Sequence, residues 1–221
     1  MRAFEHAHRL GFVEMETDIR GTRDGVAVVH HDASLERTTD RAGLIKHLTW
    51  AEVSRARIHG QEPILRLEDL LEAMPEARFT LDTKDEAAVP ALLSALDRTG
   101  EHSRVCVGAF SHRRLSQVRR SVKVTTSASP REVLRFVAAV GTGRQVSLPA
   151  DYLQVPLNIG RRRLVDERFV AAAHASGLEV HVWTIDSPTK MHELLDLGVD
   201  GIMTDRPTEL RDVLGRRGQW G

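Results

Sequence analysis

The segment EMETDIRGTRDGVAVVHHD, residues 14–32, holds the pattern that decides the fold of this 221-residue chain. EMETDI (14–19) and VAVVHH (26–31) both have the composition of β-strands, and a tight RDG turn separates them. We therefore expect one strand unit that is extended by a hairpin-like step. The segment also concentrates side chains that titrate or bind metal ions, which a strand built only for packing does not need: Glu16, Asp18, His30 and His31.

Short apolar strands and amphipathic helices alternate along the rest of the chain. Further strands are predicted at 78–84, 104–110, 122–128, 151–156, 178–185 and 200–205. Helices are predicted at 66–74, 87–100, 112–121, 130–141, 166–177, 188–198 and 207–218. Several helices begin at a proline and are followed by a glycine, which is the usual punctuation of helix ends. This alternation predicts a parallel sheet with helices outside it.

The strand count favours an α/β fold of the (β/α)8 TIM-barrel type whose first strand is missing from the chain. The pattern gives seven strand–helix units, and the chain opens with a helix, RAFEHAHRLG (2–11), in place of a strand. A closed barrel needs eight strands, and a missing one leaves two open edges. An open sheet is the alternative. No linker or composition break divides the chain, so we expect one incomplete domain over 1–221.

The composition excludes several classes of protein. Apolar residues make up 41% of the chain, and Lys+Arg 31 balances Asp+Glu 31, so no net field attracts nucleic acid or anionic lipid. The single cysteine, Cys106, lies in an apolar run and indicates a buried thiol in a reducing compartment. No segment is long enough to span a membrane, and the first ten residues are too charged for a signal-peptide core. We expect a cytoplasmic protein without stable membrane insertion.

Acidic side chains cluster where strands end, which is where α/β folds place their sites. Residues i and i+2 of a strand share a face, so Glu16 and Asp18 point the same way, as do Asp82 and Lys84. Three carboxylates at one barrel mouth repel each other unless a cation neutralises them, and oxygen ligands suit Mg²⁺ or Ca²⁺. A lysine and a histidine beside such an ion would suit a phosphate substrate.

Each of these features also has a purely structural interpretation. A Glu-x-Asp pair is commonly a solvated strand face, a His-His pair is commonly exposed or satisfied in the fold, and Trp183 could belong to the core. Their shared position at the carboxyl ends of strands favours a functional site.

The chain resembles the glycerophosphodiester phosphodiesterase family. Residues 10–43 resemble its signature region, with an E-x-D run, a T-x-D-G turn, V-V-x-H-D and L-x-R-T-T. LTWAEVSRARIHGQEPILRLEDLLEAM (48–74) continues the likeness. FTLDTK (79–84) and VHVWTID (180–186) stand where the family has E-x-K and W-T-V-N, and GVDGIMTDRP (198–207) resembles its closing motif. The likeness covers essentially the whole chain.

The resemblance implies a TIM-barrel hydrolase that uses a divalent cation to convert glycerophosphodiesters into an alcohol and glycerol 3-phosphate, in the metabolism of phospholipid breakdown products. It also implies the following roles: Glu16, Asp18 and Asp82 as metal ligands, His31 as general acid/base in preference to His30, Lys84 as a phosphate contact, Trp183 beside the alcohol, and residues 37–40 as the loop behind His31.

Two departures from the family pattern leave alternatives open. Asp82 and Asp186 replace the usual Glu and Asn, and the family's opening strand, with its His-Arg-Gly and Glu-Asn-Thr motifs, is expected upstream of Met1. His6 and His8 lie on the opening helix and cannot replace the histidine of that strand. The chain could instead be a catalytically impaired barrel that serves as a binding module, or a related phospholipase D-like enzyme. The released alcohol, the metal, the oligomeric state and the roles of His30 and Asp186 stay open.

Overall fold

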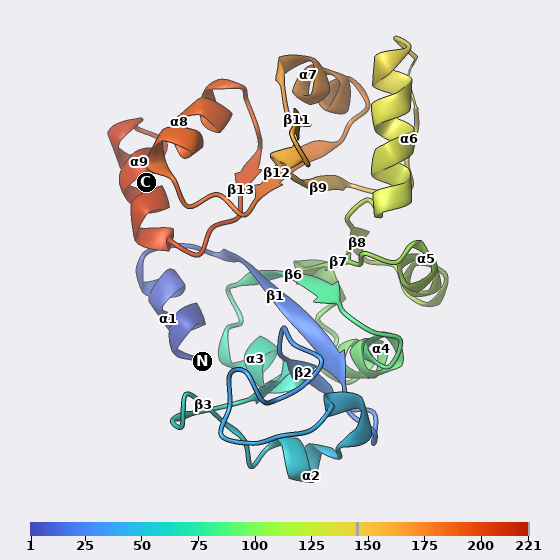
Figure 1. Ribbon diagram of the computed structural model, residues 1–221, viewed down its shortest axis with the longest axis vertical. Coiled ribbons are helices and arrows are strands. Elements are labelled where there is room, and N and C mark those ends of the chain that lie inside the picture. The colour runs from blue at the N-terminus through green and yellow to red at the C-terminus, as the bar shows by residue number, and fades with distance from the viewer. Residues whose placement is uncertain (145, 221) are drawn as a thin grey trace. The chain divides into compact units, whose positions relative to one another are not determined.

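The computed structural model describes residues 1–144 and 146–220. Contacts within the chain divide it into two compact units, an N-terminal unit, Met1–Thr125, and a C-terminal unit, Thr126–Gly221. Each unit consists of parallel strands joined by helices (Figure 1).

The N-terminal unit is built on a sheet with the strand order β5-β2-β1-β6-β7-β8. The strands of this sheet are β1 (Glu14–Gly21), β2 (Ala27–Val29), β5 (Leu65–Arg66), β6 (Arg78–Thr83), β7 (Val105–Gly108) and β8 (Thr125–Thr126), whose two residues span the boundary between the units in the sequence. Its main helices are α1 (Arg2–Arg9), α3 (Leu67–Ala73), α4 (Ala88–Thr99) and α5 (His112–Ser121). The pairs β1–β6 and β6–β7 are parallel, whereas β2 runs antiparallel to β1. The hairpin-like step predicted around the RDG turn is therefore confirmed.

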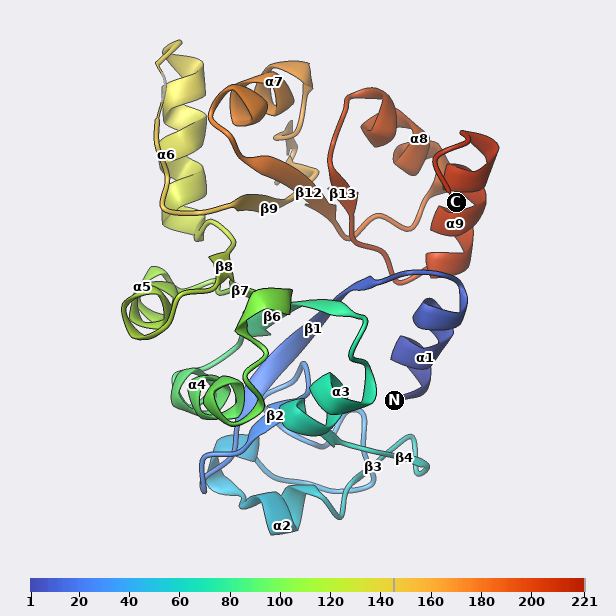
Figure 2. The ribbon, with the colours of Figure 1, turned by 180° about the vertical axis from the view of Figure 1, so that it is seen from behind.

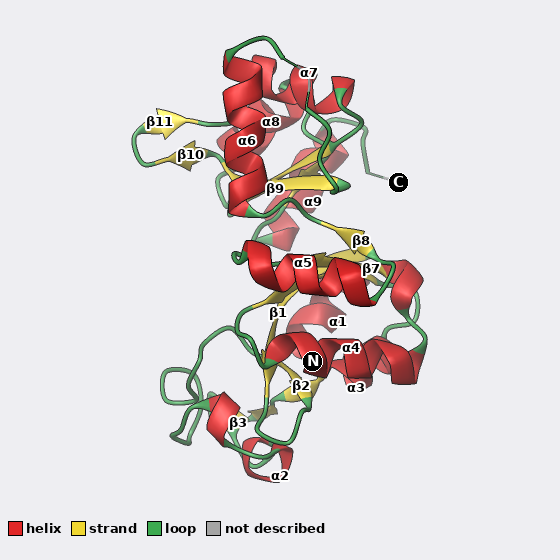
Figure 3. Cartoon of the chain, turned by 90° about the vertical axis from the view of Figure 1, so that its right-hand side faces the viewer, coloured by secondary structure: helices red, strands yellow, loops and turns green. Residues whose placement is uncertain are grey.

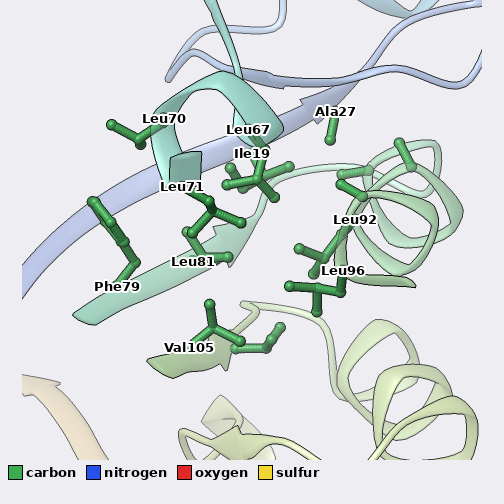
Figure 4. Packing of buried hydrophobic residues seen from close by; sticks show 14 of the residues in the cluster. Ile19, Ala27, Leu67, Leu70, Leu71, Phe79, Leu81, Leu92, Leu96 and Val105 are labelled. Atoms are coloured by element: carbon green, nitrogen blue, oxygen red, sulfur yellow. The ribbon is translucent and has the colours of Figure 1, made fainter. Parts of the chain in front are cut away.

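One face of this sheet packs against α3 and α4. Ile19 of β1 and Leu81 of β6 are fully buried there, next to Leu71 of α3 and Leu92 and Leu96 of α4 (Figure 4). Because side chains alternate along a strand, the residues on either side of Ile19 and Leu81 point to the opposite face of the sheet. Core packing thus fixes the direction in which the polar residues of β1 and β6 project.

The end of β1 lies directly against the beginning of α4. A Cβ atom at Gly21 would be 2.2 Å from the carbonyl oxygen of Ala87, so only glycine allows this close approach. This close contact between Gly21 and Ala87 holds the carboxyl end of β1 against the segment that follows β6.

The chain between β2 and β5 forms a small layer of its own, which the sequence patterns did not predict. It contains a 3₁₀ turn (Ile45–His47), α2 (Trp50–Val53), and the two-residue strands β3 (Arg57–Ile58) and β4 (Glu62–Pro63). Residues such as Leu35, Ile45 and Val53 give it a separate buried cluster. A second 3₁₀ turn, His102–Arg104, precedes β7.

The C-terminal unit has a parallel sheet in the order β13-β12-β9 (Figure 2). Its strands are β9 (Tyr152–Pro156), β12 (Glu179–Trp183) and β13 (Gly201–Ile202). Its helices are α6 (Pro130–Gly141), α7 (Glu167–Ala175), α8 (Pro188–Asp196) and α9 (Pro207–Arg216). A hairpin of β10 (Asn158–Ile159) and β11 (Arg162–Arg163) follows β9 and extends away from the sheet (Figure 3).

The mixed α/β class with a parallel central sheet agrees with the sequence prediction, and so does the opening helix α1. Cys106 is buried in β7, as its apolar surroundings predict. Among the described residues, no helix combines the length and the apolar character that crossing a bilayer requires.

Candidate active site

Asp18 and Asp82 come from neighbouring parallel strands and are paired in register. They lie one residue away from the core-facing Ile19 and Leu81, so both carboxylates project from the face opposite the helices. The sheet therefore brings two of the three predicted carboxylates side by side at the carboxyl ends of β1 and β6.

The ammonium group of Lys84 lies between these two carboxylates. Its Nζ is 2.7 Å from Oδ1 of Asp18 and 2.7 Å from Oδ2 of Asp82, and its backbone amide donates to the Ile19 carbonyl at 3.1 Å. Burial lowers the pKa of Lys84, but the two hydrogen bonds and the two negative charges outweigh it, so the pKa lies above its ordinary value. Lys84 is thus held as a cation within a carboxylate–lysine cluster of Asp18, Asp82 and Lys84.

The carboxylate–lysine cluster has donor atoms that suit a divalent ion. Oδ1 of Asp82 is buried and has no hydrogen-bond partner among the described residues, although Oδ2 binds Lys84. A hard divalent cation prefers such oxygen ligands. The third predicted ligand, Glu16, lies on the same face of β1 but is exposed. No group of three or more His, Cys, Asp or Glu residues in the described chain is arranged around a single point where an ion could bind.

His31 lies just beyond β2 and forms a pair with Asp32. Its Nδ1 is 2.7 Å from Oδ1 of Asp32, and its side chain is 67% exposed. Arg37, from the segment predicted to form the loop behind His31, binds both oxygens of Asp32, with Nη2 2.9 Å from Oδ1. The hydrogen bond from Arg37 and then that from His31 hold the pKa of Asp32 far below its ordinary range. We refer to His31, Asp32 and Arg37 as the histidine network.

This arrangement selects the reactive nitrogen of His31. An ionised Asp32 accepts a hydrogen bond from Nδ1–H, which leaves Nε2 as the nitrogen that can take or give a proton. The exposed ring can therefore exchange a proton with a bound substrate.

The neighbouring His30 is in a different environment. It is 7% exposed, its Nε2 is 3.3 Å from the Ser34 carbonyl, and its backbone amide donates to the Asp18 carbonyl at 3.0 Å. Burial lowers its pKa, although the Ser34 carbonyl and Asp32 favour the charged form. The structure thus makes His30 a packed histidine that fixes the start of the loop.

Arg20 is a further residue at this site that the sequence analysis did not single out. Its Nε and Nη2 donate to the His31 carbonyl at 3.1 and 2.7 Å, while Nη1 binds Oδ2 of Asp85 at 3.2 Å. The only available signal was its position two residues after Asp18, on the same face of β1. A strand arginine most often faces solvent, so that signal is weak.

Trp183 belongs to the C-terminal unit, where it ends β12 in register with Pro156 of β9. It is half-buried at the carboxyl end of the strand. Asp186 follows in the same loop and accepts hydrogen bonds from Thr204 Oγ1 at 2.8 Å and from the Asp205 amide at 2.9 Å. Asp186 therefore ties the loop after β12 to the loop after β13.

Carboxylates and a lysine at the carboxyl ends of parallel strands, beside an exposed histidine, are the side chains expected of an α/β hydrolase that acts on phosphate esters. The chain matches the glycerophosphoryl diester phosphodiesterase family over residues 1–209 and belongs to that family.

Individual relatives agree with this assignment. Probable glycerophosphodiester phosphodiesterase 2 of Mycobacterium tuberculosis is 39% identical, over all of this chain and 86% of its own length. A glycerophosphodiester phosphodiesterase of Bacillus altitudinis is 29% identical over 94% of this chain and 88% of its own length. The fold is also similar to the crystal structure of a glycerophosphoryl diester phosphodiesterase domain from M. tuberculosis, with a TM-score of 0.83 at 19% identity, over 96% of this chain and 91% of that one. Solved proteins of this family are TIM barrels, so the predicted fold class is confirmed.

Proposed function

We propose that this protein hydrolyses glycerophosphodiesters to an alcohol and glycerol 3-phosphate with the help of a divalent cation. Membership of the phosphodiesterase family supports the reaction. The observation that carries the proposal is the carboxylate–lysine cluster, in which Asp18 and Asp82 converge on one positive charge beside the histidine network.

Members of the family generally depend on a divalent cation. In this chain Asp18 and Asp82 would hold the ion, with the buried Oδ1 of Asp82 as an available ligand and Glu16 as the third carboxylate. A bound cation would supply positive charge to the non-bridging oxygens of the phosphodiester.

The other roles follow from the chemistry of the side chains. His31 exchanges a proton through Nε2 with the leaving or attacking oxygen, and the ionised Asp32 stabilises the imidazolium that forms when His31 takes up a proton. Lys84 contributes a second positive charge to the phosphate.

Trp183 lines the alcohol side of the substrate in this proposal, and the chain forms a single domain. A single family match across residues 1–209 supports such a domain. The lone, buried Cys106 supports a cytoplasmic location.

The first test compares wild type with Asp18→Asn and with the control Glu14→Gln. Glu14 is an exposed carboxylate on the same strand that pairs with Arg78. Binding of Mg²⁺ and Ca²⁺ is measured by calorimetry, and release of glycerol 3-phosphate is measured from glycerophosphocholine, glycerophosphoethanolamine and a lysophospholipid. We expect wild type and the control to bind the ion and turn over the water-soluble diesters, and Asp18→Asn to lose both properties.

Two results would contradict the proposal. Full metal-dependent turnover by Asp18→Asn would show that the ion does not bind at this cluster. Turnover of the lysophospholipid alone would show that the protein has the activity of the related phospholipase D-like class.

A second variant tests the role of His31. We expect His31→Ala to lower kcat by about 10²–10⁴-fold, the usual contribution of a general acid/base, with a smaller change in KM. A rise in KM at unchanged kcat would make His31 a binding residue only.

A further inference from the structure

Arg20 occupies the point where three strands of the N-terminal unit end. It is the second-last residue of β1, on the same strand face as Asp18, and its side chain is only 13% exposed. A guanidinium in such a position requires several hydrogen-bond acceptors, because a buried cation without them is unstable.

One arm of Arg20 holds the segment that follows β2. Two of its nitrogens donate to the carbonyl oxygen of His31, at 3.1 and 2.7 Å. The side chain of His31 is 67% exposed and has little packing to fix it. The hydrogen bond from the His30 amide to the Asp18 carbonyl holds the Val29–His30 peptide, so β1 fixes the backbone on both sides of the His30–His31 peptide.

The other arm holds the segment that follows β6. Nη1 of Arg20 lies 3.2 Å from Oδ2 of Asp85, the residue after Lys84. The second oxygen of Asp85 accepts a hydrogen bond from the Ala88 amide in the first turn of α4, at 2.8 Å. Asp85 is thereby fixed to the helix, and Arg20 joins that fixed point to His31.

We propose that Arg20 is a positioning residue that sets the distance between His31 and Lys84 by binding the His31 carbonyl and the Asp85 carboxylate at the same time. This inference rests on the proposed function, in which both side chains act on one phosphate. The planar guanidinium suits the task, because its fork supplies donors in two fixed directions. A lysine has a single nitrogen and cannot span both acceptors in the same way.

The kinetic consequence is a loss of turnover more than of affinity. Misplacing a reacting group by about 1 Å can cost about 10²-fold in rate. We therefore expect Arg20→Met to lower kcat by about 10²-fold with little change in KM, and Arg20→Lys to recover part of the loss. Arg78→Met serves as the control, because Arg78 is an exposed arginine on the neighbouring strand β6 that pairs with Glu14.

A double-mutant cycle separates positioning of His31 from general damage to the fold. kcat is measured for wild type, Arg20→Met, His31→Ala and the double variant, and thermal unfolding is followed for all four. If Arg20 acts through His31, adding Arg20→Met to His31→Ala lowers kcat by only a few-fold, because there is no longer an imidazole to position.

The outcomes distinguish this inference from the proposed function. Two results would overturn the role of Arg20 and leave that of His31 intact. One is an equal loss of kcat from Arg20→Met in the wild-type and His31→Ala backgrounds. The other is wild-type kcat in both Arg20→Lys and Arg20→Met. Wild-type kcat in His31→Ala would overturn the proposed role of His31, and with it this inference. If Arg20→Met does not fold, Arg20→Lys, which keeps the charge, is carried through the same cycle and judged by the same criterion.

Discussion

The carboxylate–lysine cluster and the histidine network lie on neighbouring segments of the same unit but are built in opposite ways. The cluster sits on two paired strands, and its three side chains are between 12 and 19% exposed. In the network, His31 and Arg37 are each 67% exposed on a loop. Charges that must stay together are sheltered, whereas the group that must exchange protons faces solvent.

This difference has an electrostatic reason. Two adjacent carboxylates in a sheltered site repel each other strongly, because the local dielectric constant is low, so the cluster depends on a cation. Charges on the exposed loop are screened by water and salt and contribute little to stability. Variants in the cluster should therefore affect folding and activity, and variants in the network should affect activity alone.

The largest effect is expected for Lys84→Met. Breaking a sheltered ion pair on one side costs about 3–5 kcal/mol, so the free energy of unfolding should fall by roughly that amount in chemical denaturation. We expect Mg²⁺ or Ca²⁺ to restore part of the loss, because a divalent ion neutralises Asp18 and Asp82 in place of the ammonium group. The exposed Lys123 supplies the control, Lys123→Met. Equal stability of Lys84→Met and the control would show that the cluster needs no cation.

A smaller effect is expected for Asp32→Asn in the histidine network. The neutral amide cannot stabilise an imidazolium, so kcat should fall by about 10–10²-fold, within the range of acid/base contributions. The free energy of unfolding should change by less than about 1 kcal/mol, because both partners of Asp32 are 67% exposed and ion pairs with exposed partners contribute little. A loss of stability as large as that of Lys84→Met would remove the contrast between the two regions.

The smallest effect concerns the buried His30 and is seen in the pH dependence of stability. Burial, together with the nearby Arg20 and Arg37, keeps the pKa of His30 below its ordinary 6.5, although the Ser34 carbonyl and Asp32 act in the opposite direction. The unfolded chain then binds more protons at this position than the folded chain, so stability falls as the pH drops below 6.5.

Thermal unfolding at pH 7.5 and 5.5 tests this expectation. Wild type should lose more stability between these two values than His30→Gln does. His6→Gln, at an exposed histidine of α1, should behave as wild type. An identical pH dependence in wild type and His30→Gln would mean that His30 takes up its proton without cost to the fold.

Periodicity in the sequence predicted the elements that position the site. The bounds of α5 and α6 agree with the predicted 112–121 and 130–141. The short strands β3, β4, β5, β10 and β11 were missed, because two-residue strands are too short to show an alternating pattern.

The site, like the fold, could be predicted from the sequence only in part. Asp18, Asp82 and Lys84 could be singled out because each lies in the carboxyl-terminal part of a predicted strand, and the structure brings them together. Glu16 shares the strand face of Asp18, lies farther from the strand end and is exposed. Arg20 was missed, because its partners His31 and Asp85 lie on other segments of the chain. Arg37 was placed only in the loop behind His31, and its pairing with Asp32 was not predicted.

The sequence by itself determined the alternation of strands and helices, the shared face of Glu16 and Asp18, and the family. These properties depend on spacing along one segment, since the backbone geometry of a strand sets the direction of each side chain. Only the tertiary structure decided that Lys84 bridges two carboxylates, that His30 is buried while His31 is exposed, and that Arg20 joins the segments after β2 and β6. Those facts depend on strand register and on contacts between distant residues, which no local pattern specifies.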